Sequence, residues 1–311
     1  MIKSSASGGY PLSSWIILFI LALTWGSSFI LMKRGLEVFT GFQLGALRLS
    51  IAFLCLAPFG ISALLKIKKH QIFPVLTVGI LGNGLPAFMF ATAQTKLESS
   101  QAGILNGLTP FFAFVIGVLF FKLKPNWRSI TGIALGFLGA AGLIVAKSGL
   151  NLNLNFGYSL LIVVATLFYG ISANMIKHKC TDLKAVEISA MAFSFIGVPA
   201  LITLFSLNFV GTMQSHPQAW TALGFVSVLA ICGTALAVVL FNKLLKDTSA
   251  LFGSSVTYLM PIVAVVWGIL DGEALRPIQA VFAAVILSGI YLVNYQPKVA
   301  KPEVHSSKNL P

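Results

Sequence analysis

Long apolar runs, separated by short polar connections, make up most of the chain. Most of these runs approach the roughly 20 residues that a helix needs to cross a bilayer. They lack the alternating period of barrel strands, and in lipid only helices or closed barrels satisfy the backbone hydrogen bonds. The pattern therefore predicts ten membrane-spanning helices, over about 12–32, 41–65, 72–94, 99–121, 127–146, 157–176, 185–206, 217–241, 250–270 and 275–295.

The fourth and ninth runs are two copies of one pattern. When Pro110 is aligned with Pro261, identical residues also fall at Leu108/Leu259, Ala113/Ala264, Val115/Val266, Gly117/Gly268 and Leu119/Leu270. Each copy is the fourth apolar run of five, and an odd number of spans places the second half upside down in the membrane. We therefore expect an all-α integral membrane protein of two inverted five-helix repeats, 1–148 and 149–311, around a central cavity. Inverted repeats with interrupted helices at matching positions are typical of secondary transporters.

Composition and charge support a membrane bundle and orient it. Hydrophobic residues make up 57% of the chain and charged residues only 9%, far below the charged share of a soluble domain. Positive charge concentrates in the loops on one side, which predicts that both termini are cytoplasmic in a bacterial inner membrane. The inner loops hold Lys3, Lys66, Lys68, Lys69, Lys122, Lys124, Arg128, Lys177, Lys179, Lys184, Lys243, Lys246, Lys298, Lys301 and Lys308, and the outer loops Lys33, Arg34, Lys96, Lys147 and Arg276. The net charge of +13 is thus explained by orientation, and we expect no nucleic-acid partner.

Residues that would support other classes of function are missing from the spans. The first run is expected to be a retained span rather than a signal peptide, because no small-residue cleavage site follows it. The cysteines Cys55, Cys180 and Cys232 have no disulfide or metal-binding spacing. The histidines His70, His178, His216 and His305 fall in loops or the tail, and no nucleophile–base pair lies in the spans. We therefore expect no enzyme activity, no catalytic residues, no metal and no cofactor.

The two halves match at further motifs, which together resemble a known family. Trp25-Gly26-x-Ser28 answers Tyr169-Gly170-x-Ser172, and Gly82-Asn83 answers Gly233-Thr234. With WGSSF at 25–29, Arg48 in ALRLSIAFL, and TPFFAFVIG answered by MPIVAVVWGILDGE, the chain resembles the EamA branch of the drug/metabolite transporter superfamily over about 12–296. The resemblance implies a ten-helix inner-membrane carrier for small metabolites, often an exporter of amino acids or related compounds.

The duplicated prolines are the first candidates for the substrate path. Proline inside a helix frees the carbonyl four residues earlier, here those of Asn106 and Thr257. A freed carbonyl in lipid needs a protein partner or a wet cavity. Two interpretations remain: kinks repaired by neighbouring helices, or a pair of broken helices at Pro110 and Pro261 that flank the substrate.

A second interruption is expected in the third span. Gly82, Asn83, Gly84 and Pro86 follow one another there, although glycines also serve simply for close helix packing. We expect a helix break at Pro86 and a cavity-lining position for the Asn83 amide.

Arg48 is the basic residue that lies well inside a predicted span. About 10 Å below the start of its helix, it either snorkels to the outer interface or contacts an anionic group of the substrate. The family resemblance adds that an arginine recurs in this span.

Aromatic residues with polar groups complete the candidate site. Trp25 belongs either to the interfacial belt or to the interface between the repeats, and Tyr169 shares its position in the second half. Tyr258 lies three residues before Pro261 and is expected to line the pocket.

The acidic residues narrow the chemistry of the pocket. Of Glu37, Glu98, Asp182, Glu187, Asp247, Asp271, Glu273 and Glu303, only Glu187 reaches a span, in its first turn. A proton relay through a mid-membrane carboxylate therefore has little support, and zwitterionic, neutral or anionic solutes fit better. We expect alternating-access transport of small polar metabolites such as amino acids. A flippase of a lipid-linked substrate, a channel-like pore and, less favoured, a membrane-embedded enzyme remain as alternatives; substrate, coupling ion and oligomeric state stay open.

Overall fold

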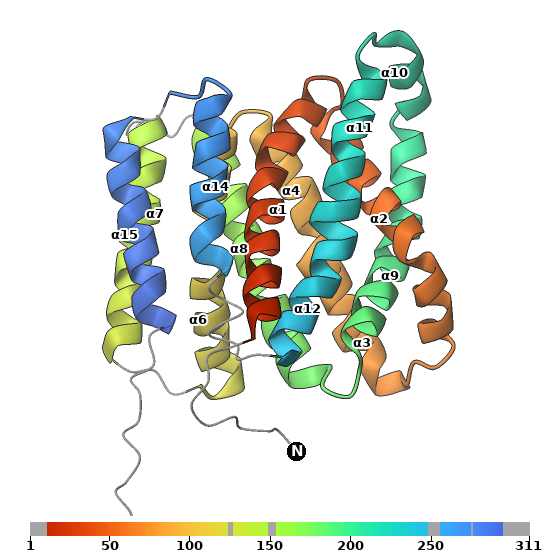
Figure 1. Ribbon diagram of the computed structural model, residues 1–311, viewed down its shortest axis with the longest axis horizontal. Coiled ribbons are helices and arrows are strands. Elements are labelled where there is room, and N and C mark those ends of the chain that lie inside the picture. The colour runs from red at the N-terminus through yellow and green to blue at the C-terminus, as the bar shows by residue number, and fades with distance from the viewer. Residues whose placement is uncertain (1–10, 124–126, 149–153, 248–255, 275, 295–311) are drawn as a thin grey trace, which may run out of the picture.

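The computed structural model describes residues 11–123, 127–148, 154–247, 256–274 and 276–294, and within these ranges the chain is helical without strands (Figure 1). Two helices contain a π-helical segment, labelled η. The elements are α1 (Leu12–Leu36), α2 (Gly41–Leu64), α3 (Lys69–Gly79), η1 (Ile80–Gly84), α4 (Leu85–Gln94), α5 (Ser99–Asn106), α6 (Thr109–Phe121), α7 (Trp127–Ser148), α8 (Leu154–Lys179), α9 (Ala185–Ser206), α10 (Phe209–Ser215), α11 (Ala219–Ala230), η2 (Ile231–Leu236), α12 (Ala237–Asp247), α14 (Val256–Leu270) and α15 (Pro277–Asn294).

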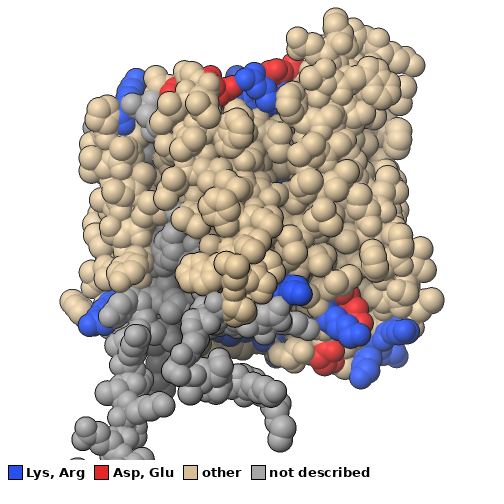
Figure 2. Space-filling view, viewed as in Figure 1, with Lys and Arg blue, Asp and Glu red and all other residues tan. Residues whose placement is uncertain are grey.

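The helices fit a membrane by length and composition. Seven helical stretches in the described part are long and apolar enough to cross: Leu12–Leu36, Gly41–Leu64, Lys69–Gln94, Ser99–Phe121, Phe156–Lys179, Ala185–Ser206 and Ala219–Leu244. Shorter apolar helices cover parts of the predicted spans 127–146, 250–270 and 275–295, so the full count of ten stays a prediction. Figure 2 shows the same division on one face, where charged side chains gather at the two ends and leave an uncharged band between them.

The two halves interlock instead of forming separate bundles. The four most extensive helix pairs are α2 with α9, α7 with α15, α1 with α14, and α6 with α8, and each joins a helix before residue 149 to one after it. This set of pairs is unchanged when matching spans of the two halves are exchanged. An approximate twofold relation between the halves therefore governs the packing, with α7 and α15 side by side at one edge (Figure 1).

Similar capping interactions begin two of the paired helices. The Thr40 side chain accepts from the backbone of Gln43, whose side chain accepts in return from the Thr40 backbone; at the start of α9 only the second of these bonds forms, from the Lys184 backbone nitrogen to Glu187 Oε2 at 2.7 Å. A capping box satisfies backbone donors that the first helical turn leaves unpaired. When the two N-cap residues, Thr40 and Lys184, are aligned, Arg48 of the first half corresponds to Ala192 of the second.

The fourth and ninth spans run in opposite directions. Ser99 and Ser100, at the start of α5, lie within hydrogen-bond distance of Glu273, which follows the end of α14. We call this end of the molecule the Lys33 end, because Lys33 lies in the last turn of α1 there. The other end, where α6 and α8 finish, is the Lys122 end.

Candidate functional site

The interruption predicted at Gly82 and Gly233 is a π-helical turn in both halves. η1 and η2 begin at Ile80 and Ile231, positions separated by the same spacing as Pro110 and Pro261. Such single wide turns occur frequently at functional sites. Here each one widens its own helix near the midpoint of the third or the eighth span.

One polar side chain stabilises each wide turn. Thr234 Oγ1 donates to the carbonyl of Leu229 at 3.2 Å, and Asn83 Nδ2 donates to the carbonyl of Val78 over a longer 3.4 Å. Each bond spans five residues, so Asn83 and Thr234 play matching roles. Asn83 is partly buried, whereas Thr234 is 3% exposed.

The serine of each motif contacts the π-turn of the opposite half. A Cβ placed on Gly233 would lie 2.8 Å from Oγ of Ser28, and one placed on Gly82 would overlap Oγ of Ser172. Trp25 adds a hydrogen bond from Nε1 to the carbonyl of Gly233 at 3.0 Å. Trp25 therefore joins the two halves through its polar group, which answers the choice between repeat interface and belt in favour of the interface.

The glycine of each motif also contacts the opposite half. A Cβ on Gly26 would lie 2.5 Å from Cβ of Val263 on α14, and a Cβ on Gly170 would lie 2.7 Å from both the carbonyl carbon of Phe112 and the nitrogen of Ala113 on α6. Phe112 and Val263 are matching positions of the duplicated segment. Both motifs thus need glycine because a helix of the other half passes at backbone distance.

Arg48 reaches from α2 to the second π-turn. Its Nε donates to Oγ1 of Thr234 at 2.8 Å, so this hydroxyl accepts from Arg48 and donates to Leu229. Tyr169 lies within electrostatic range of the guanidinium, and its ring stacks on Phe90 at 6.0 Å. Among the described residues no carboxylate forms an ion pair with Arg48.

The prolines occupy different helical contexts in the two copies. Pro110 is in the first turn of α6, after an interruption at Gly107 and Leu108, and Thr109 Oγ1 donates to the Asn106 carbonyl at 2.9 Å. Pro261 lies inside α14, which is continuous from Val256 to Leu270. The pattern of matching breaks is thus not repeated at Pro261 in the described part of the ninth span; Met260 stands where the first copy has the hydroxyl of Thr109.

The remaining predicted site residues are only partly placed by the structure. Pro86 is in the first turn of α4, directly after η1, and the Asn106 side chain is buried. Thr257 is partly buried one turn before Pro261. The side chain of Tyr258 lies outside the described residues. Within the described part, no group of three or more histidine, cysteine or acidic side chains is placed to hold a metal ion.

A buried carboxylate joins the two halves at the Lys33 end. Glu273 Oε1 accepts from the backbone nitrogen and hydroxyl of Ser99 at 2.9 and 2.7 Å, and Oε2 accepts from those of Ser100 at 3.0 and 2.6 Å. The carboxylate thus caps the N-terminus of α5, where a negative charge is favoured by the helix dipole. Glu98, the residue at the N-cap position, makes no capping bond with its own side chain.

Lys33 completes this arrangement, which we call the Glu273 cluster (Lys33, Ser99, Ser100, Asp271 and Glu273). Its Nζ lies 2.9 Å from Glu273 Oε1 and 2.6 Å from Asp271 Oδ2. Burial acts to raise the pKa of Glu273, but the hydrogen bonds from Ser100, Lys33 and Ser99 outweigh it and lower the pKa to about 2. Gly272, with φ of +81°, forms the left-handed turn that lets both carboxylates reach Lys33.

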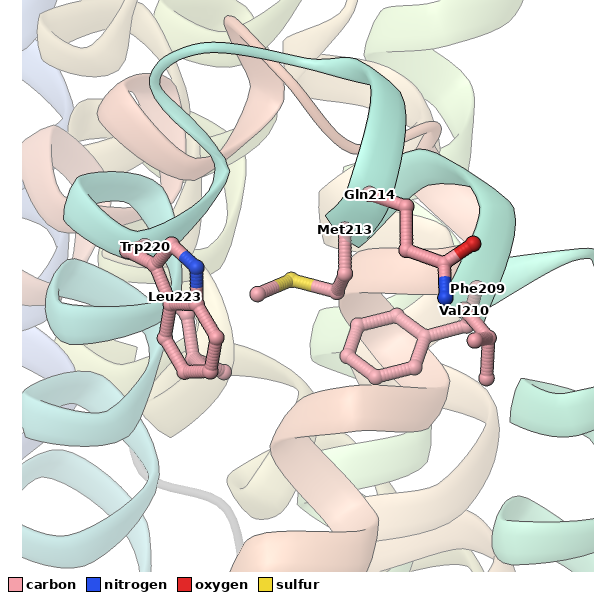
Figure 3. A pocket seen from close by; sticks show the side chains of 6 residues that line it. All are labelled: Phe209, Val210, Met213, Gln214, Trp220 and Leu223. Carbon is pink, nitrogen blue, oxygen red and sulfur yellow. The ribbon is translucent and has the colours of Figure 1, made fainter.

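Two pockets of the described structure do not include Arg48 in their lining. The larger, of about 470 Å³, is an apolar groove at the Lys33 end, where Phe209 and Met213 of α10 face Trp220 and Leu223 of α11 (Figure 3). The smaller, of about 240 Å³, lies between α1 and η2 and includes Gly233, the residue bound by Trp25. The predicted central cavity therefore remains a prediction.

Sequence reasoning found most of the contact positions but not their partners. The repeat identified Ser28, Ser172 and Thr234 as matches, yet it could not show that each one contacts the opposite half or Arg48. Glu273 was expected only to lie outside the spans, with no role assigned to it. The signal that could have identified it is the Asp-Gly-Glu turn, which follows an apolar helix and answers a basic sequence in the first half.

Comparison with known proteins agrees with this architecture. The EamA-like transporter family model matches the chain twice, over residues 13–145 and 156–295. A solved crystal structure superposes with a TM-score of 0.61 at 16% identity, covering 90% of this chain and 96% of that one, which supports the fold alone.

Similar curated proteins are membrane transporters. The uncharacterized inner membrane transporter YedA of Escherichia coli is 26% identical, covering 91% of this chain and 93% of its own. The S-adenosylmethionine/S-adenosylhomocysteine transporter of Chlamydia trachomatis is 25% identical (84% and 83%), and a probable terminal-alkyne amino-acid exporter of Streptantibioticus cattleyicolor is 22% identical (89% and 92%). With two family matches that together span most of its length, this chain belongs to the EamA-like transporter family.

Proposed function

We propose that this membrane transporter moves small polar metabolites, amino acids among them, by alternating access between two inverted five-helix repeats. The observation that carries the proposal is the reciprocal contact between each Gly-x-Ser motif and the opposite half. Gly26 and Gly170 pack on matching positions, and Ser28 and Ser172 lie against matching π-turns. The proposal includes ten spans and cytoplasmic termini in a bacterial inner membrane.

Reciprocal contacts suit a carrier for a physical reason. When two repeats of opposite orientation adopt slightly different shapes, exchanging those shapes turns an inward-open molecule into an outward-open one. The same residue types then meet equivalent surfaces in both states, so neither state loses its packing. A fixed pore has no need of two equivalent packings.

The candidate site supports a polar solute. Arg48 donates to Thr234 of the opposite half with Tyr169 within electrostatic range, and this contact supports a polar path between the halves. The proposed path also includes Asn83, Asn106 and Thr257. Two of the similar transporters carry names of amino-acid-type compounds, which favours the same class of solute here.

Counterflow in proteoliposomes tests this function. Vesicles preloaded with one unlabelled amino acid or nucleoside should accumulate its labelled form transiently and saturably, with and without a pH gradient. Protein-free vesicles are the control. Flux that neither saturates nor shows counterflow would favour the channel, and movement of lipid-linked substrates alone would favour the flippase.

A further inference from the structure

We propose that Arg48 is the binding site for a carboxylate of the transported solute, an inference that rests on the proposed function. The guanidinium carries five N–H donors, and the one hydrogen bond observed in the described structure uses only Nε. The terminal nitrogens, which form the fork that binds a carboxylate with two parallel bonds, are not hydrogen-bonded to any described residue.

The environment of Arg48 also points to an anionic ligand. A charge within a span is costly unless it is paired or faces water, and such residues commonly mark substrate pathways. The acids that form ion pairs in the described part all lie at helix ends or in loops, and none of them pairs with Arg48. A solute carboxylate would supply the counter-charge that the described residues do not.

Thr234 positions the guanidinium. Its hydroxyl is held by the bond to Leu229 in the π-turn, and it receives Nε of Arg48 at 2.8 Å. This bond directs the Arg48 side chain from α2 to η2 of the opposite half, instead of along its own helix toward the membrane surface. Because Arg48 corresponds to Ala192 in the second repeat, this cation has no counterpart at the matching position. A solute with one carboxylate matches this asymmetry.

The test compares each L-amino acid with its carboxamide, which keeps the ammonium and side chain but removes the negative charge. With the parent protein, the acid should compete with the labelled substrate far better than its carboxamide does. R48Q should lose at least 30-fold in affinity for the acid while the affinity for the amide stays within threefold. T234V should reduce the acid-to-amide ratio several-fold, and T234S should restore it.

Thr203 provides a matched control, since its hydroxyl bonds only to Pro199 of its own helix on an exposed face. T203V should leave the ratio unchanged. If R48Q discriminates acid from amide as well as the parent, Arg48 does not bind the carboxylate. If the parent exchanges none of these compounds, the proposed function fails instead.

A second, independent observation concerns the Glu273 cluster. We infer that it is a gate that closes the Lys33 end, the predicted outer face, and that the transporter rests closed on that side. The cluster ties the end of α14 to the last turn of α1 and the first turn of α5 in the other half. Four hydrogen bonds from serines and two ion pairs of Lys33 make this connection, and Arg34 adds an ion pair with Asp271. Opening between the halves at this end has to break all of them together.

The matching positions at the Lys122 end cannot form such a gate. Lys122 stands where the second copy has Glu273, and Lys177 stands where the first has Lys33. Two cations repel each other, so these two positions cannot form the same ionic closure at the Lys122 end. A resting state closed outside loads its solute from inside, which favours export.

A buried polar side chain next to the cluster fits a closed state that must open. Gln101 is 1% exposed, and neither its Nε2 nor its Oε1 has a hydrogen-bond partner in the described part of the chain. Unpaired buried polar groups are unfavourable. Opening of the Glu273 cluster would admit water to them, so this level of α5 is a suitable reporter of opening.

Thiol labelling tests the gate without any substrate. In protein with Cys55, Cys180 and Cys232 replaced by serine, a single Q101C is labelled with a membrane-impermeant maleimide from each side of oriented vesicles. Adding E273Q or K33Q should speed labelling from the Lys33 side at least tenfold. E187Q is the control, because Glu187 accepts from the Lys184 backbone at the start of α9, at the opposite end of the molecule.

Labelling within twofold of the parent for both E273Q and K33Q, in protein that remains folded, would overturn the gate. Since no solute is added, this result is separate from the outcome of the counterflow assay. Faster labelling without any exchange would keep the gate and reject the proposed function.

Discussion

Substituting Gly170 by alanine is expected to abolish exchange and to destabilise the fold. The added Cβ would lie 2.7 Å from two backbone atoms of α6, at Phe112 and Ala113, and backbone cannot move aside as a side-chain tip can. Overpacking of this kind costs about 1–3 kcal/mol. It would also push α8 away from α6 and so separate the two halves where they cross. Thermal unfolding in detergent and counterflow measure the two effects.

Two further substitutions test this prediction: G26A, at the matching position of the first half, and G224A, at a glycine with open space around it. G26A should behave similarly, because its Cβ would meet Val263 and the carbonyl oxygen of Met260. Gly224, inside α11, has nothing within 4 Å of its Cβ position, so G224A should stabilise by about 0.5–1 kcal/mol through helix propensity alone. A melting temperature of G170A at or above that of G224A would show that the close approach of α8 and α6 is not needed.

Neutralising Glu273 is expected to give the second large effect. Its carboxylate is 2% exposed and accepts from four serine donors and from Lys33. In E273Q, an amide nitrogen would face serine donors, and Lys33 would lose one of its two ion-pair partners. Removing one member of a buried ion pair costs about 3 kcal/mol. Chemical or thermal unfolding of purified protein should show this loss, whereas E37Q, on a half-exposed surface pair, should differ little from the parent.

The pH dependence of that loss has a definite sign. The pKa of Glu273 falls from 4.5 to about 2 in the folded protein, so the carboxylate contributes its stability above pH 4.5 and loses it as the pH falls through about 2. The gap in stability between parent and E273Q should therefore be constant from pH 5 to 8 and shrink below 4.5. A gap that closes already near pH 6 would contradict the hydrogen-bonding environment described for Glu273.

The sequence predicted local features well because they depend on nearby residues. Apolar runs located the helices, and the Gly82/Gly233 match located both π-turns, since the cause of each interruption lies within a few residues. Partners distant in the chain were not predictable. Trp25 and Gly233 are 208 residues apart, and apolar spacing carries no information on which helix faces which. Pro261 shows the limit of matching alone, because it lies inside α14 whereas Pro110 lies in the first turn of α6.

The division of each contact between the halves has a consequence for how the protein is made. Ser99 and Glu273 are 174 residues apart, and at about 5–20 residues per second their synthesis is separated by roughly 10–30 s. During that interval the first repeat sits in the membrane with Arg48 unanchored, the first turn of α5 uncapped and the Trp25 indole without its acceptor. The first half alone therefore exposes unpaired polar groups to lipid. We expect that it needs shielding at the insertion site until the second half is translated.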